Sequence, residues 1–145
     1  MKRHATAIWQ GALADGKGTL DTQSGALKEA PYSFKGRFQD ESGRSGTNPE
    51  ELIAAAHAGC FAMQLSHLLA ESGSPAEKLD AKAEVTVQEA SGGGFEIVRS
   101  AIMLVGTVPG ISEETFVRIA REAKEVCPVS KALGAIDVTL EARLA

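Results

Sequence analysis

The chain has 145 residues, of which 43% are hydrophobic and 23% are charged, and its formal net charge is −4. This length and composition are typical of one folded domain over residues 1–145 and argue against intrinsic disorder. A mildly acidic chain without a run of Lys and Arg is a poor candidate for nucleic-acid binding, which needs a basic patch.

The distribution of apolar residues argues against a membrane span and a secretory signal. The most apolar stretch, Leu52 to Met63, is interrupted by His57 and is shorter than the roughly 20 residues that a bilayer needs. No apolar block of signal-peptide length follows the basic residues 1–4. We therefore expect a cytoplasmic protein that binds no membrane. Two cysteines in such a protein favour redox, catalytic or metal chemistry over a structural disulfide framework.

The first half of the chain predicts short strands followed by a long helix. Strand candidates are residues 6–9, 18–21 and 32–38, separated by turn-forming Gly, Ser and Pro. Asn48 then suits a helix N-cap before a proline at the first helical position. The helix is predicted to run to about Glu71. Its apolar residues cover most of its circumference, which is typical of a buried central helix.

The second half predicts a hairpin, a second helix and a final strand. Residues 83–88 alternate apolar and polar side chains, and a run of glycines leads into a long strand over residues 95–108. Ser112 can cap the second helix, which the proline after Cys127 interrupts. Residues 136–143 alternate most clearly. This order predicts an α+β fold with a mostly antiparallel curved sheet. The long helix leaves apolar surface uncovered, so we expect a homodimer.

Cys60 lies inside the predicted long helix. The simplest interpretation of this residue alone is a buried structural thiol, because free cysteine is among the most buried residue types. Two neighbours weaken that interpretation. Gly59 leaves open space beside the sulfur, although a helical glycine costs about 1 kcal/mol relative to alanine. His57 lies on the same side of the helix, where it could donate to a thiolate or simply pack.

Cys127 precedes Pro128 at a helix break. At the cap of a short helix, unpaired backbone N–H groups would stabilise its thiolate; a small apolar residue at a helix end is the alternative. Pairing of Cys60 with Cys127 is the simplest hypothesis for a chain with two cysteines. A metal site with His57 as a further ligand is another, but closed zinc sites usually need four protein ligands, so we expect no metal.

Arg37, Glu50 and Glu51 each have a simple structural explanation, as a surface arginine and as acids that complement a helix dipole. A thiolate that attacks peroxide nevertheless needs a nearby cation, and a carboxylate can hold that cation in place. Glu50 lies about 15 Å along the helix from Cys60. Arg37 would therefore have to bridge that gap from elsewhere in the fold, and a partner subunit could supply it.

Three motifs stand out: residues 47–52 (TNPEEL), 54–61 (AAAHAGCF) and 127–133 (CPVSKAL). Together with the chain length and the element order, these motifs resemble the OsmC/Ohr family of organic hydroperoxide resistance proteins. Residues 31–38 (PYSFKGRF) resemble the OsmC branch rather than the Ohr branch. The resemblance covers essentially the whole chain.

The resemblance implies an intertwined homodimer with two active sites at the subunit interface. It implies that Cys60 is the peroxidatic cysteine, that Cys127 resolves it, that Arg37 activates the thiolate, and that Glu50 orients this arginine. The implied activity is the reduction of organic hydroperoxides to alcohols, which protects against oxidative and osmotic stress. The implied reductant is an external dithiol, such as a lipoylated protein, with no metal or organic cofactor.

Apolar residues near the sulfur would favour alkyl hydroperoxides over hydrogen peroxide. The candidates for this substrate pocket are Phe38, Phe61, Met63 and His57, although the same residues could belong to a plain core. A non-catalytic dimeric protein that binds an apolar or lipid-like ligand is the alternative function, because a fold does not fix a function.

Overall fold

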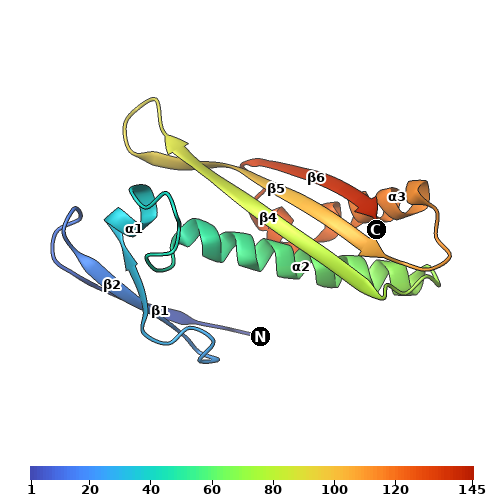
Figure 1. Ribbon diagram of the computed structural model, residues 1–145, viewed down its shortest axis with the longest axis horizontal. Coiled ribbons are helices and arrows are strands. Elements are labelled where there is room, and N and C mark those ends of the chain that lie inside the picture. The colour runs from blue at the N-terminus through green and yellow to red at the C-terminus, as the bar shows by residue number, and fades with distance from the viewer. The chain divides into compact units, whose positions relative to one another are not determined.

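The computed structural model describes all residues, 1–145, and they form two compact units, residues 1–52 and 53–145 (Figure 1). Each unit is described by itself below. The prediction of one domain over residues 1–145 stays a prediction. The predicted α+β class is confirmed, but the strands form two three-stranded sheets rather than one curved sheet.

The first unit contains an antiparallel sheet in the order β1-β2-β3. Its strands are β1 (Ala5–Gln10), β2 (Lys17–Thr22) and β3 (Ala30–Ser33). The rings of Trp9 and Tyr32 pack across this sheet with their centroids 5.4 Å apart. The strands predicted over residues 6–9 and 18–21 are therefore confirmed.

The strand predicted over residues 32–38 is wrong beyond Ser33. The chain instead forms a short helix, α1 (Phe34–Phe38). Ser33 caps this helix, because its hydroxyl accepts a hydrogen bond from the Gly36 N–H at 3.0 Å. Serine is a preferred N-cap residue, and a single helical turn is too short to show a helical period in the sequence.

The long helix, α2 (Pro49–Glu71), begins where the sequence predicts. Asn48 Oδ1 accepts a hydrogen bond from the Glu51 N–H at 2.8 Å, which satisfies one of the free donors at the helix start. The fully buried residues of α2 follow one stripe: His57, Phe61, Leu65 and Leu69. Burial within this chain is thus confined to one side, and Met63 on another side is 76% exposed.

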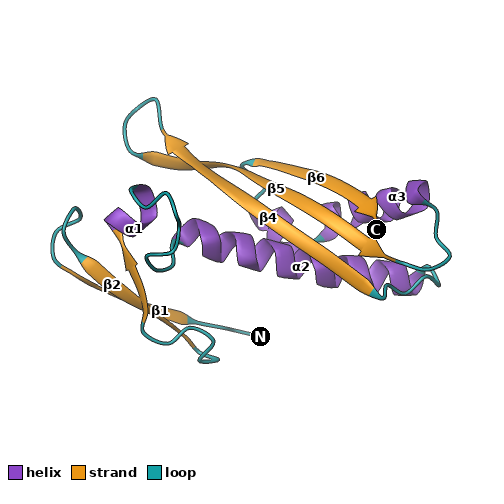
Figure 2. Ribbon diagram, viewed as in Figure 1, coloured by secondary structure: helices purple, strands orange, loops and turns teal.

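The second sheet has the order β4-β5-β6. β4 (Lys78–Glu89) and β5 (Phe95–Thr107) form the predicted antiparallel hairpin. β6 (Asp137–Leu144) pairs with β5 in parallel. A parallel pair needs a long crossover connection, which α3 (Glu113–Val126) and α4 (Pro128–Ala132) supply. Figure 2 shows these strands and helices by type.

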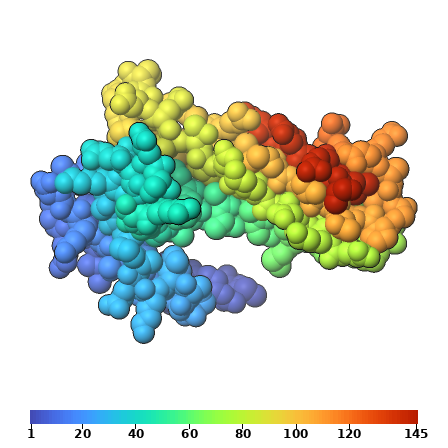
Figure 3. Space-filling model, viewed as in Figure 1, coloured from blue at the N-terminus to red at the C-terminus, as the bar shows by residue number.

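The core of the second unit lies between this sheet and two helices. It contains Phe61, Leu65 and Leu69 of α2, Ile102 and Leu104 of β5, and Phe116, Ile119, Ala120 and Ala123 of α3. In the space-filling view the three strands form the near surface of this unit, with part of α2 visible below β4 (Figure 3).

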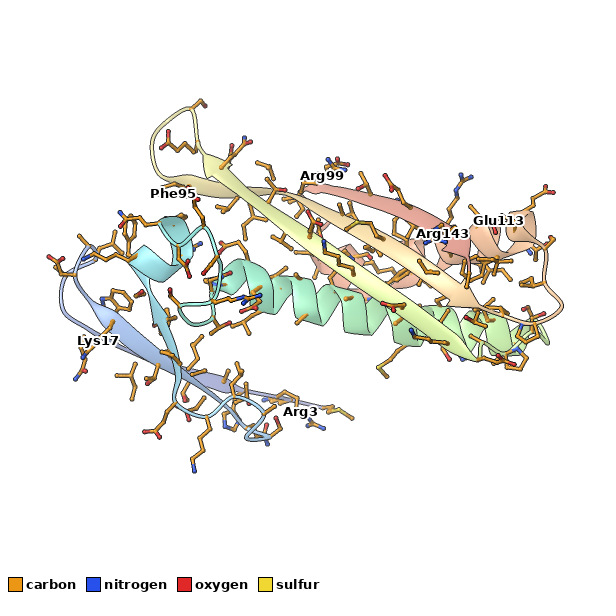
Figure 4. The ribbon with its side chains drawn as sticks, in the orientation of Figure 1. Arg3, Lys17, Phe95, Arg99, Glu113 and Arg143 are labelled. Atoms are coloured by element: carbon orange, nitrogen blue, oxygen red, sulfur yellow. The ribbon has the colours of Figure 1, made fainter.

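Two contacts secure α3 against the sheet. Gly106 of β5 lies under the Phe116 ring, so closely that a Cβ atom built on the glycine would be 2.4 Å from a ring carbon. Glu113, at the start of α3, accepts a hydrogen bond from the Leu144 N–H at 3.0 Å and ties the end of β6 to the helix (Figure 4).

The α2 helix has 23 residues, and an 18-residue stretch of it has a mean hydropathy of 1.4, so the helix is long and apolar enough to cross a membrane by length and composition alone. The apolar stretch from Leu52 to Met63 is only the middle part of this helix. A mostly buried core helix of a soluble protein passes the same test; within this chain 22% of the apolar stretch of α2 is buried, as one stripe packed into the core of the second unit.

Candidate active site

The two cysteines of the chain meet in the second unit. Cys60 lies on α2 and Cys127 lies between α3 and α4, and their sulfur atoms are 3.2 Å apart. Both are free thiols. Cys127 is fully buried, whereas Cys60 is partly exposed. Of the two sulfur atoms, that of Cys60 is the one placed to meet a molecule from solution.

Local sequence explains the position of Cys127. Its N–H closes α3 by donating to the Ala123 carbonyl at 2.9 Å, and its backbone is then extended, with φ −61° and ψ 123°. Proline disfavours helical geometry in the residue before it, but it suits the first position of the next helix. Pro128 therefore ends α3 and begins α4, and it leaves Cys127 at the N-cap as predicted.

The two thiols differ in how readily they ionise. Burial raises the pKa of Cys60, and Cys127 beside it adds to the rise, against a hydrogen bond from the Val129 backbone. Burial opposes ionisation of Cys127 too. Hydrogen bonds from the Ser130 backbone, Cys60, the Ser130 hydroxyl and the Val129 backbone outweigh it, and the pKa of Cys127 lies below its ordinary value. Within this chain, Cys127 is the more easily ionised thiol.

His57 occupies a buried polar position next to the cysteines. Its Nδ1 is 2.7 Å from Ser100 Oγ on β5, and its Nε2 is 2.8 Å from Ser130 Oγ on α4. Both ring nitrogens are therefore engaged, and burial lowers the pKa of the ring. The sequence did not indicate Ser100 or Ser130 as partners, because they lie 43 and 73 residues from His57 along the chain.

The predicted arginine and glutamate meet in the first unit. Arg37 Nε lies 3.1 Å from one carboxylate oxygen of Glu50, and a terminal guanidinium nitrogen lies 2.6 Å from the other. Bidentate pairs of this kind hold the guanidinium plane in a fixed orientation. The sequence left open whether Glu50 or Glu51 pairs with Arg37. The partner is Glu50, since Glu51 instead accepts a hydrogen bond from the Thr47 hydroxyl at 2.8 Å.

The four residues proposed for a substrate pocket lie in different surroundings. Phe61 is fully buried in the core, His57 is buried in its polar position, and Met63 is 76% exposed. Phe38 belongs to the first unit, where the Arg37 guanidinium lies 4.7 Å from the centre of its ring. Their role as a pocket stays a prediction.

The structure shows no arrangement of ligands that matches the metal site considered with Cys60, Cys127 and His57. No group of three or more His, Cys, Asp and Glu side chains is arranged to hold a metal ion. Both nitrogens of His57, the ligand proposed beside the cysteines, already have serine hydroxyls as partners.

Cys60 is a partly exposed thiol on the long helix α2, and it contacts the buried thiol of Cys127. The helix packs against a three-stranded sheet. These features define an α+β protein with a cysteine pair. The comparisons with known proteins place it more closely. The family described as "OsmC-like protein" matches residues 40–141, so the chain belongs to the OsmC family.

Named relatives agree with this assignment. The chain is 45% identical over 138 residues to "Peroxiredoxin OsmC" of Escherichia coli (strain K12), with 95% of this chain and 93% of that protein covered. It is 36% identical over 105 residues to "Organic hydroperoxide resistance protein OhrB" of Bacillus subtilis (strain 168), with 70% and 73% covered. The crystal structure of OhrB from Bacillus subtilis is also similar, with a TM-score of 0.75, 28% identity, and 97% and 98% of the two chains covered.

Proposed function

We propose that the protein is a thiol-dependent peroxidase that reduces organic hydroperoxides to alcohols. The observation that carries this proposal is the 3.2 Å approach of the Cys60 and Cys127 sulfurs in a chain of the OsmC family. The names of the relatives, a peroxiredoxin and organic hydroperoxide resistance proteins, support the same class of substrate.

The proposed cycle uses the two sulfurs in turn. The Cys60 thiolate attacks the distal oxygen of ROOH, the O–O bond breaks, and ROH leaves after it gains a proton. Cys60 is then a sulfenic acid. The Cys127 sulfur attacks the Cys60 sulfur and displaces its oxygen as water, which leaves a disulfide. An external dithiol, such as a lipoylated protein, restores both thiols by exchange.

We propose that Cys60 is the attacking thiol. Its partial exposure supports this role, whereas Cys127 is fully buried. Ionisation of Cys60 then needs help, because burial raises the pKa of its thiol. We propose that Arg37, oriented by Glu50, supplies the positive charge that stabilises the Cys60 thiolate and polarises the peroxide. The bidentate Arg37–Glu50 pair supports this role, because it fixes the direction of the guanidinium.

We propose that the working form is an intertwined homodimer in the cytoplasm. The exposed side of the apolar helix α2, with Met63 76% exposed, supports a second copy as its cover. The dimer would also provide a route by which Arg37 of one subunit reaches Cys60 of the other.

The test is a single reaction with peroxide. Fully reduced protein is mixed with one equivalent of cumene hydroperoxide, and free thiols and intact mass are measured. We expect both thiols to disappear, with a mass decrease equal to the two thiol hydrogens, and we expect a slower reaction with hydrogen peroxide. Survival of both thiols would contradict the peroxidase proposal and favour the non-catalytic binding protein.

A further inference from the structure

The proposed cycle leaves one buried ionisable side chain without a role. His57 is 0% exposed and lies three residues before Cys60 on α2. A buried polar group must find hydrogen-bond partners, because an unpaired one is costly. The partners of His57 therefore indicate what the side chain can do.

Ser100 determines which nitrogen of His57 carries the proton. The Ser100 side chain is fully buried, and its Oγ is 2.7 Å from His57 Nδ1. With the proton on Nδ1, the ring would donate to Ser100, and the Ser100 O–H would lose this acceptor. With the proton on Nε2, the Ser100 O–H donates to Nδ1. The second arrangement is favoured because it pairs the O–H of the fully buried Ser100 and leaves unassigned the O–H of Ser130, which is 8% exposed.

Ser130 accepts a hydrogen bond from the one N–H of the ring. Nε2–H then donates to Ser130 Oγ at 2.8 Å, so the Ser130 O–H does not point to His57 and is available to another acceptor. Ser130 lies in the first turn of α4, whose N-cap is Cys127, and its hydroxyl contributes to the lowered pKa of Cys127. The Cys127 sulfur is the acceptor that this placement offers. Hydrogen bonds thus run in one direction from Ser100 through His57 to Ser130, in the helical turn that begins at Cys127.

We propose that the donor chain formed by Ser100, His57 and Ser130 acts on the second half of the cycle. It holds the Ser130 hydroxyl as a hydrogen-bond donor to the Cys127 thiolate, so it speeds disulfide formation and not the attack of Cys60 on peroxide. The three side chains are positioning residues. This inference rests on the proposed peroxidase function.

Disulfide formation balances without any proton transfer to or from the His57 ring. The new bond joins the two sulfurs, the S–O bond of the Cys60 sulfenic acid breaks, and the proton of the Cys127 thiol leaves with that oxygen as water. Burial lowers the pKa of His57, so the ring stays neutral near pH 7. The ionisable groups that face Cys127 are Cys60 directly and His57 through Ser130.

The test removes the last donor. Ser130→Ala deletes the hydroxyl, Ser130→Thr retains it, and Ser91→Ala changes an exposed serine in the β4–β5 turn as a matched control. Each reduced protein is mixed with one equivalent of cumene hydroperoxide. The loss of peroxide reports the attack by Cys60. The intact mass after acid quenching reports disulfide formation.

Ser130→Ala should consume peroxide no more slowly than the protein without the substitution, because less negative charge on Cys127 does not raise the pKa of Cys60. The variant should form the disulfide more slowly. Losing a hydrogen bond to an anion raises a thiol pKa by about one unit, while the less acidic thiolate is a somewhat better nucleophile. The disulfide step should therefore be about three- to tenfold slower at pH 7. Its pH midpoint should rise by about one unit, and the defect should vanish above that midpoint. Ser130→Thr should restore the rate.

Two results would overturn the inference. One is an unchanged disulfide step in Ser130→Ala; the other is a step slowed equally at every pH, which would indicate a structural role alone. A second measurement needs no peroxide: titration of thiolate absorbance in a Cys60→Ser background, where Ser130→Ala should raise the Cys127 midpoint and Ser100→Ala should raise it less. Equal midpoints would contradict the donor chain. Failure of the unchanged protein to consume peroxide would instead contradict the proposed function.

Discussion

Replacing Glu50 by glutamine is the sharpest test of the Arg37–Glu50 pair. The carboxylate accepts two hydrogen bonds from the guanidinium, at 3.1 and 2.6 Å, and the Glu50 and Arg37 side chains are 10% and 32% exposed. Glutamine has the same shape but no charge. One carboxylate oxygen becomes an NH₂ group that faces a guanidinium N–H, so a donor meets a donor.

The expected loss of stability follows from this geometry. A lost hydrogen bond to a charged group costs about 1.5–3 kcal/mol, and breaking a fully buried ion pair costs about 3–5 kcal/mol. Water can reach the partly exposed Arg37 and offset some of that cost, so we expect about 2 kcal/mol. In a chain of 145 residues, this corresponds to a Tm lower by roughly 4–8 °C.

Glu51→Gln is the matched control, because Glu51 is the next residue of α2 and is exposed, with the Thr47 hydroxyl as its partner. Its effect should stay within about 0.5 kcal/mol. Thermal unfolding followed by circular dichroism compares the two variants, and peroxide consumption should fall in Glu50→Gln alone. Equal losses of stability in both variants would refute the argument from the bidentate pair.

Four further changes have definite expected outcomes. Cys60→Ser should abolish peroxide consumption, and turnover retained in this variant would end the proposed mechanism. Cys127→Ser should consume one equivalent of peroxide and stop as a sulfenic acid, visible by mass; normal cycling would remove Cys127 from the cycle. Gly106→Ala should lower the unfolding free energy by about 1–3 kcal/mol in denaturant, because the new methyl group overlaps the Phe116 ring. In Gly59→Ala the new methyl group meets nothing within 4 Å, so the unfolding free energy should rise by up to about 1 kcal/mol. A lower unfolding free energy would argue against open space beside Cys60.

Local chemistry explains which elements the sequence predicts well. Asn48 before a proline and Ser112 before acidic residues specify helix starts through contacts of a few residues, and both caps are present. Strict alternation likewise identifies β6, where Val138, Leu140 and Ala142 pack against the core. These patterns need no knowledge of the rest of the fold.

Other features depend on contacts that a local pattern does not contain. The α1 helix is one turn, and its sequence alternates enough to suggest a strand until the Ser33 cap is seen. The apolar residues of α2 cover most of its circumference, so they do not indicate which stripe packs against β5. Phe61 and Met63 therefore looked equivalent, although one is buried and the other is exposed.

The hydrogen-bonded group of His57, Ser100 and Ser130 in the second unit is the part that the sequence predicts least. In the sequence, His57 is a neighbour of Cys60 that could donate to a thiolate or simply pack, and a candidate for a metal site and for the substrate pocket. The structure links His57 to a serine on β5 and to another on α4, at sequence separations of 43 and 73 residues. Partners at such distances are set by the topology of the sheet and its crossover, and no motif spacing indicates them.

The wide spacing of the cysteines along the chain would let the proposed disulfide stabilise the fold itself. Cys60 and Cys127 are separated by 67 residues. A covalent link between them closes a loop of that length in the unfolded chain, and the lost conformational freedom is worth about 4 kcal/mol. Oxidation would therefore turn the protein into its more heat-resistant form, and reduction would reverse this. Molecules that have just met peroxide would be the ones that best withstand unfolding until reductant reaches them.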